Sequence, residues 1–178
     1  MPNADAEPPD PARRRAWVAV AIVVAVVAID QLTKGWAVAE LDDGPWRIIG
    51  DDVELRLTRN TGSAFSLFQG FTPLLAVLAA ALVVLLVRAL HRTDDTWVVV
   101  ALALILGGAI GNLIDRAVQP PSFLEGAVVD FVSVSSFPTF NVADSAITVG
   151  AVLLIVRTLF GERGERDRRA ERHDEAAA

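Results

Sequence analysis

Four long apolar segments occupy much of this sequence and limit the folds that it can adopt. They run from about Trp17 to Ala39, Pro73 to Leu90, Trp97 to Leu113 and Ala143 to Phe160. Each has the length that the hydrocarbon core of a bilayer requires of a helix, roughly 17–25 residues. Hydrophobic residues make up 53% of the 178 residues, more than an ordinary soluble domain of this size contains. The sequence therefore predicts an all-α membrane protein with four transmembrane helices.

The basic residues predict how these helices are oriented, because cytoplasmic loops of membrane proteins carry an excess of lysine and arginine. Four arginines lie in the connections between the first and second segments and between the third and fourth, and Lys34 lies inside the first segment. We therefore expect both termini and the loop between the second and third segments to be cytoplasmic. The other eleven of the 16 basic residues support this: Arg13, Arg14, Arg15, Arg88, Arg92, Arg157, Arg163, Arg166, Arg168, Arg169 and Arg172.

The two ends of the chain differ in composition from the span of residues 13–160, which we expect to form one transmembrane domain. Residues 1–12 are rich in Pro, Asp and Ala, and residues 161–178 are dense in mixed charge. Neither end can bury enough apolar surface to offset its ordering entropy, so we expect disordered cytoplasmic tails. The alternative for 161–178 is a continuation of the fourth helix.

The connection between the first two segments contains a strand pattern. "VELRL" (Val53–Leu57) alternates apolar and charged residues, which is the period of a half-buried strand. "IIG" before it and "GSAFSLF" after it can supply partner strands, and Gly62 permits an unusual backbone angle. We expect a small extracytoplasmic β-sheet over about residues 44–70.

Polar residues from separate segments gather at the predicted outer end of the bundle. Asp130 lies in the last connection and Asp144 at the start of the fourth segment. Ionisable groups inside or beside a membrane are costly, and their presence by default indicates a functional site. The same predicted depth holds Asp30, Gln31, Lys34, Asn112, Asp115, Arg116 and Asn141.

Each of these residues also has a purely structural interpretation. Asn141 or Asp144 could cap the fourth helix, and Asp30 and Lys34, spaced i,i+4, could neutralise each other. Asp115 and Arg116 could form an interfacial ion pair. "GGAIG" (Gly107–Gly111) has the small-residue spacing of close helix packing. Taken together at one depth, the polar residues favour a functional site.

The residue types limit the chemistry of such a site. The chain has no cysteine and two histidines, His91 and His173, both in polar surroundings, so thiolate and histidine sites are poorly supplied. Two aspartates held close together cannot both ionise easily, so one keeps a proton while the other acts as a base on water. Such a pair needs no cofactor. Asp130 and Asp144 can meet only if the segment containing Phe137–Pro138 folds back.

Five blocks of the sequence resemble the signal peptidase II, or lipoprotein signal peptidase, family. In order they are "DQLTK" from Asp30, "RNTGSAFSLF" from Arg59, "GGAIGNLIDR" from Gly107, "VVDF" from Val128 and "FNVADSAI" from Phe140. The resemblance implies an aspartic endopeptidase of the bacterial inner membrane. Such enzymes remove the signal peptide from diacylglyceryl-modified prolipoproteins by cutting before the lipidated cysteine, and they are the target of the antibiotic globomycin.

The resemblance also implies roles for individual residues. Asp130 and Asp144 match the catalytic pair. The implied partners are prolipoprotein substrates and membrane lipids, with no nucleic acid, no cofactor and a monomeric enzyme. The positions that match residues supporting the site or binding substrate are Asp30, Lys34, Asn60, Asn112, Arg116 and Asn141.

Three other functions agree less well with the sequence. A proton- or ion-coupled transporter using Asp30, Asp130 and Asp144 as a relay predicts acidic groups spread across the bilayer, whereas these gather at one side. A non-catalytic scaffold that packs through its glycines leaves the polar cluster unexplained. Intramembrane aspartyl proteases of another family typically carry a glycine-x-glycine-aspartate motif, which the sequence lacks.

Overall fold

The computed structural model describes residues 10–50, 52–62, 72–120 and 123–177, with side chains through residue 161. It contains four long helices: α1 (Pro11–Glu40), α2 (Thr72–Leu90), α3 (Thr96–Val118) and α4 (Val142–Ala177). Each contains a stretch long and apolar enough to cross a membrane. The prediction of a four-helix membrane protein is therefore confirmed.

Helices α1 and α3 begin earlier than the apolar segments because polar capping residues precede them. Asp10 accepts a hydrogen bond from the backbone N of Ala12 at 3.0 Å, and Pro11 occupies the first turn, where proline is favoured. Asp95 caps α3 by accepting from Trp97 N at 2.8 Å. At the other end, α4 continues to Ala177, so residues 161–177 follow the helical alternative rather than the expected disordered tail.

Helix α3 is the centre of the bundle. It packs against α1, α2 and α4, and half of its most apolar window is buried, against 11–17% for the other three helices. Small residues make this contact close: a Cβ on Gly107 would meet Val26 of α1, and a Cβ on Gly108 would clash with the backbone of Ala143 in α4. The "GGAIG" stretch therefore has the packing role that its spacing indicates.

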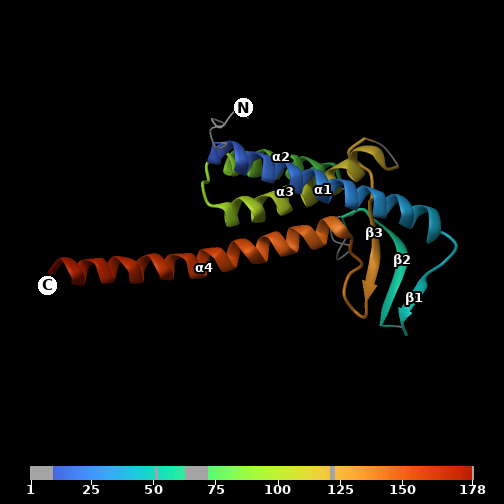
Figure 1. The fold of residues 1–178 in the computed structure, drawn as a ribbon. Coiled ribbons are helices and arrows are strands. Elements are labelled where there is room, and N and C mark those ends of the chain that lie inside the picture. The colour runs from blue at the N-terminus through green and yellow to red at the C-terminus, as the bar shows by residue number, and fades with distance from the viewer. Residues whose placement is uncertain (1–9, 51, 63–71, 121–122, 178) are drawn as a thin grey trace, which may run out of the picture.

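The two ends of the bundle are different. The start of α1, the end of α4 and the α2–α3 connection lie at one end, and the β-strands lie at the other (Figure 1). This is the grouping that the distribution of basic residues predicts. We call these the terminal end and the sheet end.

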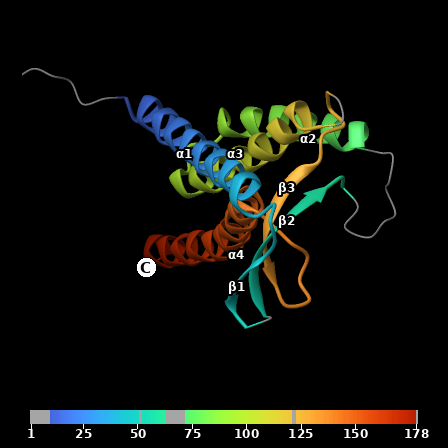
Figure 2. The ribbon, with the colours of Figure 1, turned by 90° about the vertical axis from the view of Figure 1, so that its right-hand side faces the viewer.

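The sheet end carries three antiparallel strands in the order β1 (Trp46–Ile49), β2 (Val53–Asn60) and β3 (Val128–Val134) (Figure 2). Strand β2 contains the predicted "VELRL" strand, and β1 overlaps "IIG". The expected partner "GSAFSLF" lies, after Gly62, outside the described residues. Strand β3 comes from the α3–α4 connection instead, so confining the sheet to residues 44–70 was wrong.

Strand β3 is fixed against the end of α1. Phe131 is buried together with Ala37 and Leu41, and apolar side chains of β2 pack against this cluster. Trp36 stacks edge-on against Phe131, with ring centroids 6.3 Å apart. Asp130 therefore lies on a strand held firmly at the sheet end of the bundle.

Candidate active site

The chain does fold back between the two aspartates. After β3 it turns at Ser135, which has a positive φ of 46°, and Phe140 then pairs with Val132 in an antiparallel bridge. The backbone N of Val132 donates to Phe140 O, and Phe140 N donates to Val132 O, both at 2.9 Å. This pairing places the next residue, Asn141, beside Asp130.

Asn141 connects the two aspartates directly. Its Nδ2 donates to Asp130 Oδ1 at 2.7 Å, and its Oδ1 accepts from the backbone N of Asp144 at 2.9 Å. Its own backbone N donates to Asp144 Oδ2 at 3.3 Å. The structure thus brings together Asp130 from the sheet and Asp144 from the membrane helix through the side chain and backbone of Asn141.

Two further asparagines bind the remaining carboxylate oxygens. Asn112 Nδ2, on α3, donates to Asp144 Oδ1 at 2.8 Å, and Asn60 Nδ2, on β2, donates to Asp130 Oδ2 at 3.0 Å. Asn60 can reach Asp130 because it lies two residues after Thr58, which pairs with Asp130 across the sheet. It also accepts from the N of Gly62 at 2.8 Å, and Gly62 has the expected unusual angle, φ 95°.

The contacts between Asn141 and Asp144 also form a capping box at the start of α4. In such a box the N-cap side chain bonds to a backbone N–H three residues on, whose side chain bonds back to the N-cap N–H. The structural interpretation, that these residues cap the fourth helix, is therefore correct. It does not compete with a role in the site, because Asp144 uses its other oxygen to bind Asn112.

A cluster of buried charged side chains, the ion cluster, supports Asp130 and Asp144. Asp30, Lys34 and Asp115 are 0%, 3% and 1% exposed. Lys34 Nζ lies 2.8 Å from Asp30 Oδ2 and 2.9 Å from Asp115 Oδ2. It also donates to Asn112 Oδ1 at 3.0 Å, which orients the amide that binds Asp144. Asp30 and Lys34 do neutralise each other, as the i,i+4 spacing suggests.

The cluster also fixes the backbone around both aspartates. Asp30 Oδ1 accepts from the N of Ala143 at 2.9 Å, one of the helix-start donors that lack a partner within α4. Asp115 Oδ2 accepts from the N of Val129, next to Asp130, at 3.0 Å. Gly111 lets this happen, because a Cβ there would lie 2.5 Å from Asp30 Oδ2.

Sequence reasoning missed the importance of Asp115 and Gln31. Among the described residues Asp115 is ion-paired with Lys34 rather than with its neighbour Arg116. Gln31 Nε2 lies 3.1 Å from both Asp30 Oδ2 and Asp115 Oδ1 and so joins them. The sequence does contain one lysine and two acidic residues on helices that face each other. Their pairing can be recognised only when the packing of those helices is known.

Arg116 lies beside the asparagines rather than within the ion cluster. Its Nη1 donates to the backbone O of Asn112 at 3.2 Å. Its Nε is buried and has no hydrogen-bond partner among the described residues. An unsatisfied buried donor costs about 1–3 kcal/mol, so this group is available to a ligand that offers an acceptor.

The two carboxyls do not have equal surroundings. Asp130 is 1% exposed, and its burial, followed by the charge of Asp144, raises its pKa to about 6. Hydrogen bonds from Asn60 and Asn141 oppose this rise. Asp144 is partly exposed and lies in the first turn of α4. Asp130 is therefore the better holder of a proton.

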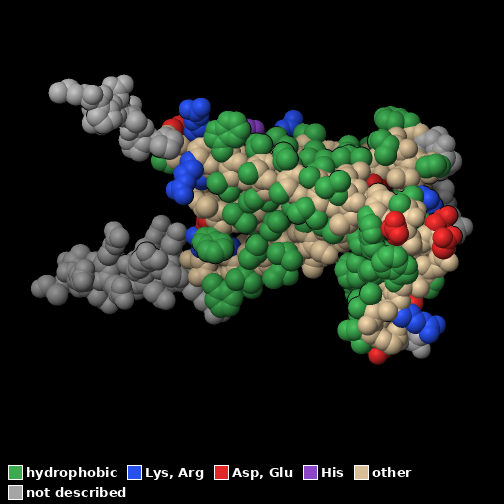
Figure 3. Space-filling model, turned by 45° about the vertical axis from the view of Figure 1, so that its right-hand side comes forward, with side chains coloured by type: hydrophobic (Ala, Val, Ile, Leu, Met, Phe, Trp, Pro, Cys, Tyr) green, Lys and Arg blue, Asp and Glu red, His purple; other side chains and the backbone are tan. Residues whose placement is uncertain are grey.

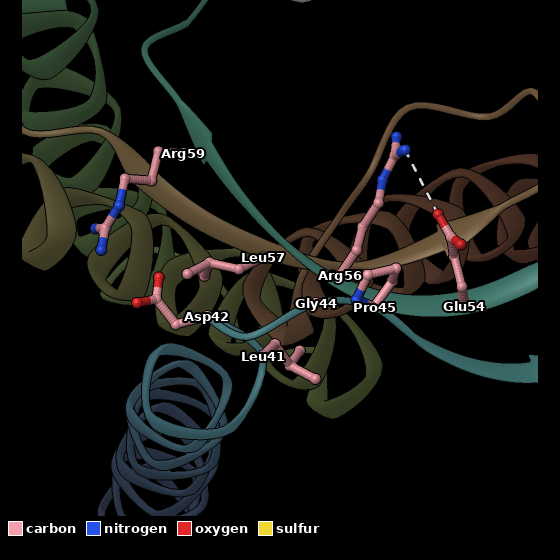
Figure 4. Close-up of a pocket in the computed structure, with 8 residues that line it drawn as sticks. All are labelled: Leu41, Asp42, Gly44, Pro45, Glu54, Arg56, Leu57 and Arg59. Carbon is pink, nitrogen blue, oxygen red and sulfur yellow. Dashed lines mark ion pairs between the residues drawn. The ribbon is translucent and has the colours of Figure 1, made fainter.

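A separate cavity of about 510 Å³ lies at the sheet end between the α1–β1 connection and β2 (Figure 4). Leu41, Asp42, Gly44, Pro45, Glu54, Arg56, Leu57 and Arg59 line it. Arg56 and Glu54 form an ion pair of 3.4 Å at one side. Neither aspartate of the pair lines this cavity, so it is distinct from the site described above.

Comparison with known proteins identifies the family. The family described as signal peptidase (SPase) II matches residues 22–160. A lipoprotein signal peptidase of Rhodococcus jostii is 46% identical over 161 residues, covering 90% of this chain and 81% of that protein. The chain belongs to the signal peptidase II family.

Further relatives agree with this membership. A lipoprotein signal peptidase of Mycobacterium tuberculosis (strain H37Rv) is 43% identical over 161 residues, covering 90% of this chain and 77% of that protein. A bacterial membrane enzyme solved by the in meso method at 1.9 Å resolution superposes with a TM-score of 0.71 at 29% identity, covering 80% of this chain and 93% of that one. The resemblance found in the sequence blocks is thereby confirmed, and as a signal peptidase II the chain is a multi-pass membrane peptidase.

Proposed function

We propose that this signal peptidase II removes the signal peptide from diacylglyceryl-modified prolipoproteins by aspartic catalysis at Asp130 and Asp144. The observation that carries the proposal is the bridge through Asn141, which holds a buried carboxyl and a helix-start carboxyl together at one end of a membrane bundle. The names of the relatives supply the substrate class. The pair supplies chemistry that needs no cofactor.

The difference between the two carboxyls suggests their roles. Asp144, ionised, takes a proton from a water molecule while that water attacks the carbonyl carbon of the scissile bond. Asp130, protonated, donates to the carbonyl oxygen. The tetrahedral intermediate then collapses: Asp144 returns its proton to the leaving nitrogen, and Asp130 recovers a proton from the hydroxyl as the new carboxyl forms.

The neighbours of the pair fit supporting roles. The carboxyl planes are fixed by Asn60, Asn112 and Asn141. Lys34 orients Asn112 and offsets the negative charges of Asp30 and Asp115. Arg116 is suited to bind a substrate carbonyl through its Nε, which has no hydrogen-bond partner among the described residues.

The position of the pair suits a substrate that is itself a membrane helix. Basic residues at the terminal end favour a cytoplasmic location for it, which leaves the sheet end outside. A signal peptide spanning the bilayer presents its lipid-bearing end at that outer surface, with the acyl chains still in the hydrocarbon. We propose cleavage there, just before the lipidated cysteine, by a monomeric enzyme.

The decisive experiment is single-turnover cleavage of a lipidated precursor by Asp130→Asn and Asp144→Asn. Asparagine keeps the size of aspartate and can accept a hydrogen bond, but it cannot exchange the proton. Each variant should lose cleavage while keeping its thermal stability in detergent. Asp43→Asn, at an exposed sheet-end position, is the control. Asp115 is unsuitable because it is buried and ion-paired. Near-normal cleavage by either of these two aspartate variants, that is, by a variant of the catalytic dyad Asp130 and Asp144, would refute the proposal.

Substrate class is tested separately with the wild-type enzyme. The same precursor is offered with and without its diacylglyceryl group, and the released signal peptide is quantified. We expect the unlipidated form to be cut poorly or not at all. Equal rates would remove lipid recognition from the proposal while leaving the dyad chemistry intact.

A further inference from the structure

An apolar groove opens between α1 and α2 at the terminal end of the bundle. These two helices both pack on α3 but have no close backbone approach to each other among the described residues. The resulting cavity is about 370 Å³. Its walls and floor are almost entirely aliphatic, and representative residues are Ala16, Val20 and Val24 of α1, Val87 and Leu90 of α2, and Val99 of α3.

The length of the groove matches one leaflet of a bilayer. Beyond Arg15 its lining on α1 runs from Ala16 to Val24, which at the helical rise of 1.5 Å per residue is ~12 Å. Half of a hydrocarbon core is ~15 Å. A transmembrane helix of a partner would need a surface about twice as long, so the groove suits an acyl chain better than a helix.

The mouth of the groove is polar and lies at the basic end of the molecule. Arg15, His91, Thr93 and Asp94 line it, and Arg15 is ion-paired with Asp94 at 2.5 Å, which joins α1 to the α2–α3 connection. Figure 3 shows basic side chains at this end of the molecule. Near Arg15, His91 and Thr93 in the sequence lie four more arginines, all exposed. These are Arg13, Arg14, Arg88 and Arg92.

We propose that this groove binds one acyl chain of an anionic membrane phospholipid, whose headgroup is held by Arg15 at the mouth. The apolar walls select a hydrocarbon chain, and the excess of arginine at this end of the bundle selects a negative headgroup. Basic pockets between helices at a cytoplasmic surface are a recurrent site for such lipids. The groove is separate from the pair Asp130 and Asp144. Arg15 at the mouth of the groove lies ~22 Å along α1 from Asp30, which belongs to the ion cluster beside that pair.

Two matched pairs of variants of the full chain test this proposal. Arg15→Gln removes the charge at the mouth, and Arg13→Gln removes an exposed charge at the same end that does not line the groove. Ala16→Trp fills the groove, and Ala25→Trp adds the same bulk to an exposed position of α1 outside it. Phosphatidylglycerol and phosphatidylcholine with identical acyl chains are added at equal concentration to each protein in detergent. The lipid retained is measured by native mass spectrometry.

Wild type, Arg13→Gln and Ala25→Trp should retain phosphatidylglycerol in preference to phosphatidylcholine. Arg15→Gln should lower that preference roughly fivefold, the effect expected of one basic residue at a membrane surface. Ala16→Trp should lower retention of both lipids. Equal loss in Arg15→Gln and Arg13→Gln, or unchanged retention in Ala16→Trp, would overturn the proposal. A dimer in wild type that Ala16→Trp abolishes would overturn it in favour of a second copy in the groove.

Discussion

Replacing Asn60 with alanine should move the pH dependence of cleavage in a direction that the structure dictates. Asp130 has a pKa of about 6 because its burial and the Asp144 charge outweigh the hydrogen bonds from Asn60 and Asn141. Below that pH Asp130 holds its proton, and above it the proton is lost. If Asp130 is the acid, kcat/KM falls tenfold for each pH unit on the alkaline side of its pH profile. In the wild type this alkaline limb begins near pH 6.

The size of the shift follows from the hydrogen bond that is removed. Asn60 Nδ2 donates to Asp130 Oδ2 at 3.0 Å and stabilises the ionised form. Hydrogen bonds to charged groups contribute about 1.5–3 kcal/mol, and one pKa unit corresponds to about 1.4 kcal/mol. Asn60→Ala should therefore raise the limb by about one to two units. For a one-unit shift, the ratio of variant to wild-type kcat/KM should rise roughly eightfold between the acid plateau and pH 7.5.

The assay is cleavage of a lipidated precursor in detergent across pH 4.5–8.5, since the limb position is independent of the absolute rate. Asn60 also accepts from the N of Gly62, so its replacement removes that contact as well. Thr72→Val controls for that, because it removes the Thr72 hydrogen bond to Thr61 O without touching Asp130. Its limb should stay at the wild-type position. An Asn60→Ala limb that stays put or moves to lower pH would refute Asp130 as the proton donor.

Three further predictions concern stability and topology. Lys34→Met leaves two buried carboxylates without their cation and should lower the free energy of unfolding in detergent by about 3–5 kcal/mol. The exposed control Arg13→Gln should lower it by less than about 0.5 kcal/mol. Similar losses in the two variants would contradict the ion cluster. Gly111→Ala forces Asp30 to move and should cost about 1–3 kcal/mol and slow cleavage; an unchanged melting temperature would count against that close contact. Reporter fusions at the C-terminus and in the α2–α3 connection should score cytoplasmic, and one at Gly44 external, whereas any reversed signal would invert the proposed orientation.

Much of the fold was predictable because a membrane limits the possibilities. Long apolar segments in a bilayer must be helices, since helices satisfy their own backbone polar groups. Strand β2 was predictable because one face is half-buried and the residues alternate. Strand β3 was not, because it is buried along most of its length and "VVDFVSV" shows little alternation.

The residues of the candidate site could be proposed from the sequence, but their geometry could not. The common depth of the polar residues follows from helix lengths, and the family blocks indicate the pair. That Asp130 reaches Asp144 depends on the bridge between Val132 and Phe140, a pairing that no local pattern specifies. That Asp115 binds Lys34 rather than the adjacent Arg116 depends on how α1 packs on α3.

The structural and catalytic interpretations of Asp144 describe the same contacts. A helix start has backbone N–H groups without partners, and in α4 these are bound by Asn141 and Asp30. The bonds that satisfy them also fix the backbone of Asp144, and the capping box fixes one of its oxygens. A side chain with so little freedom needs little reorganisation to act on a water, which is the advantage of a preorganised site. Asp144 can therefore be a base held at a fixed depth because the helix begins there.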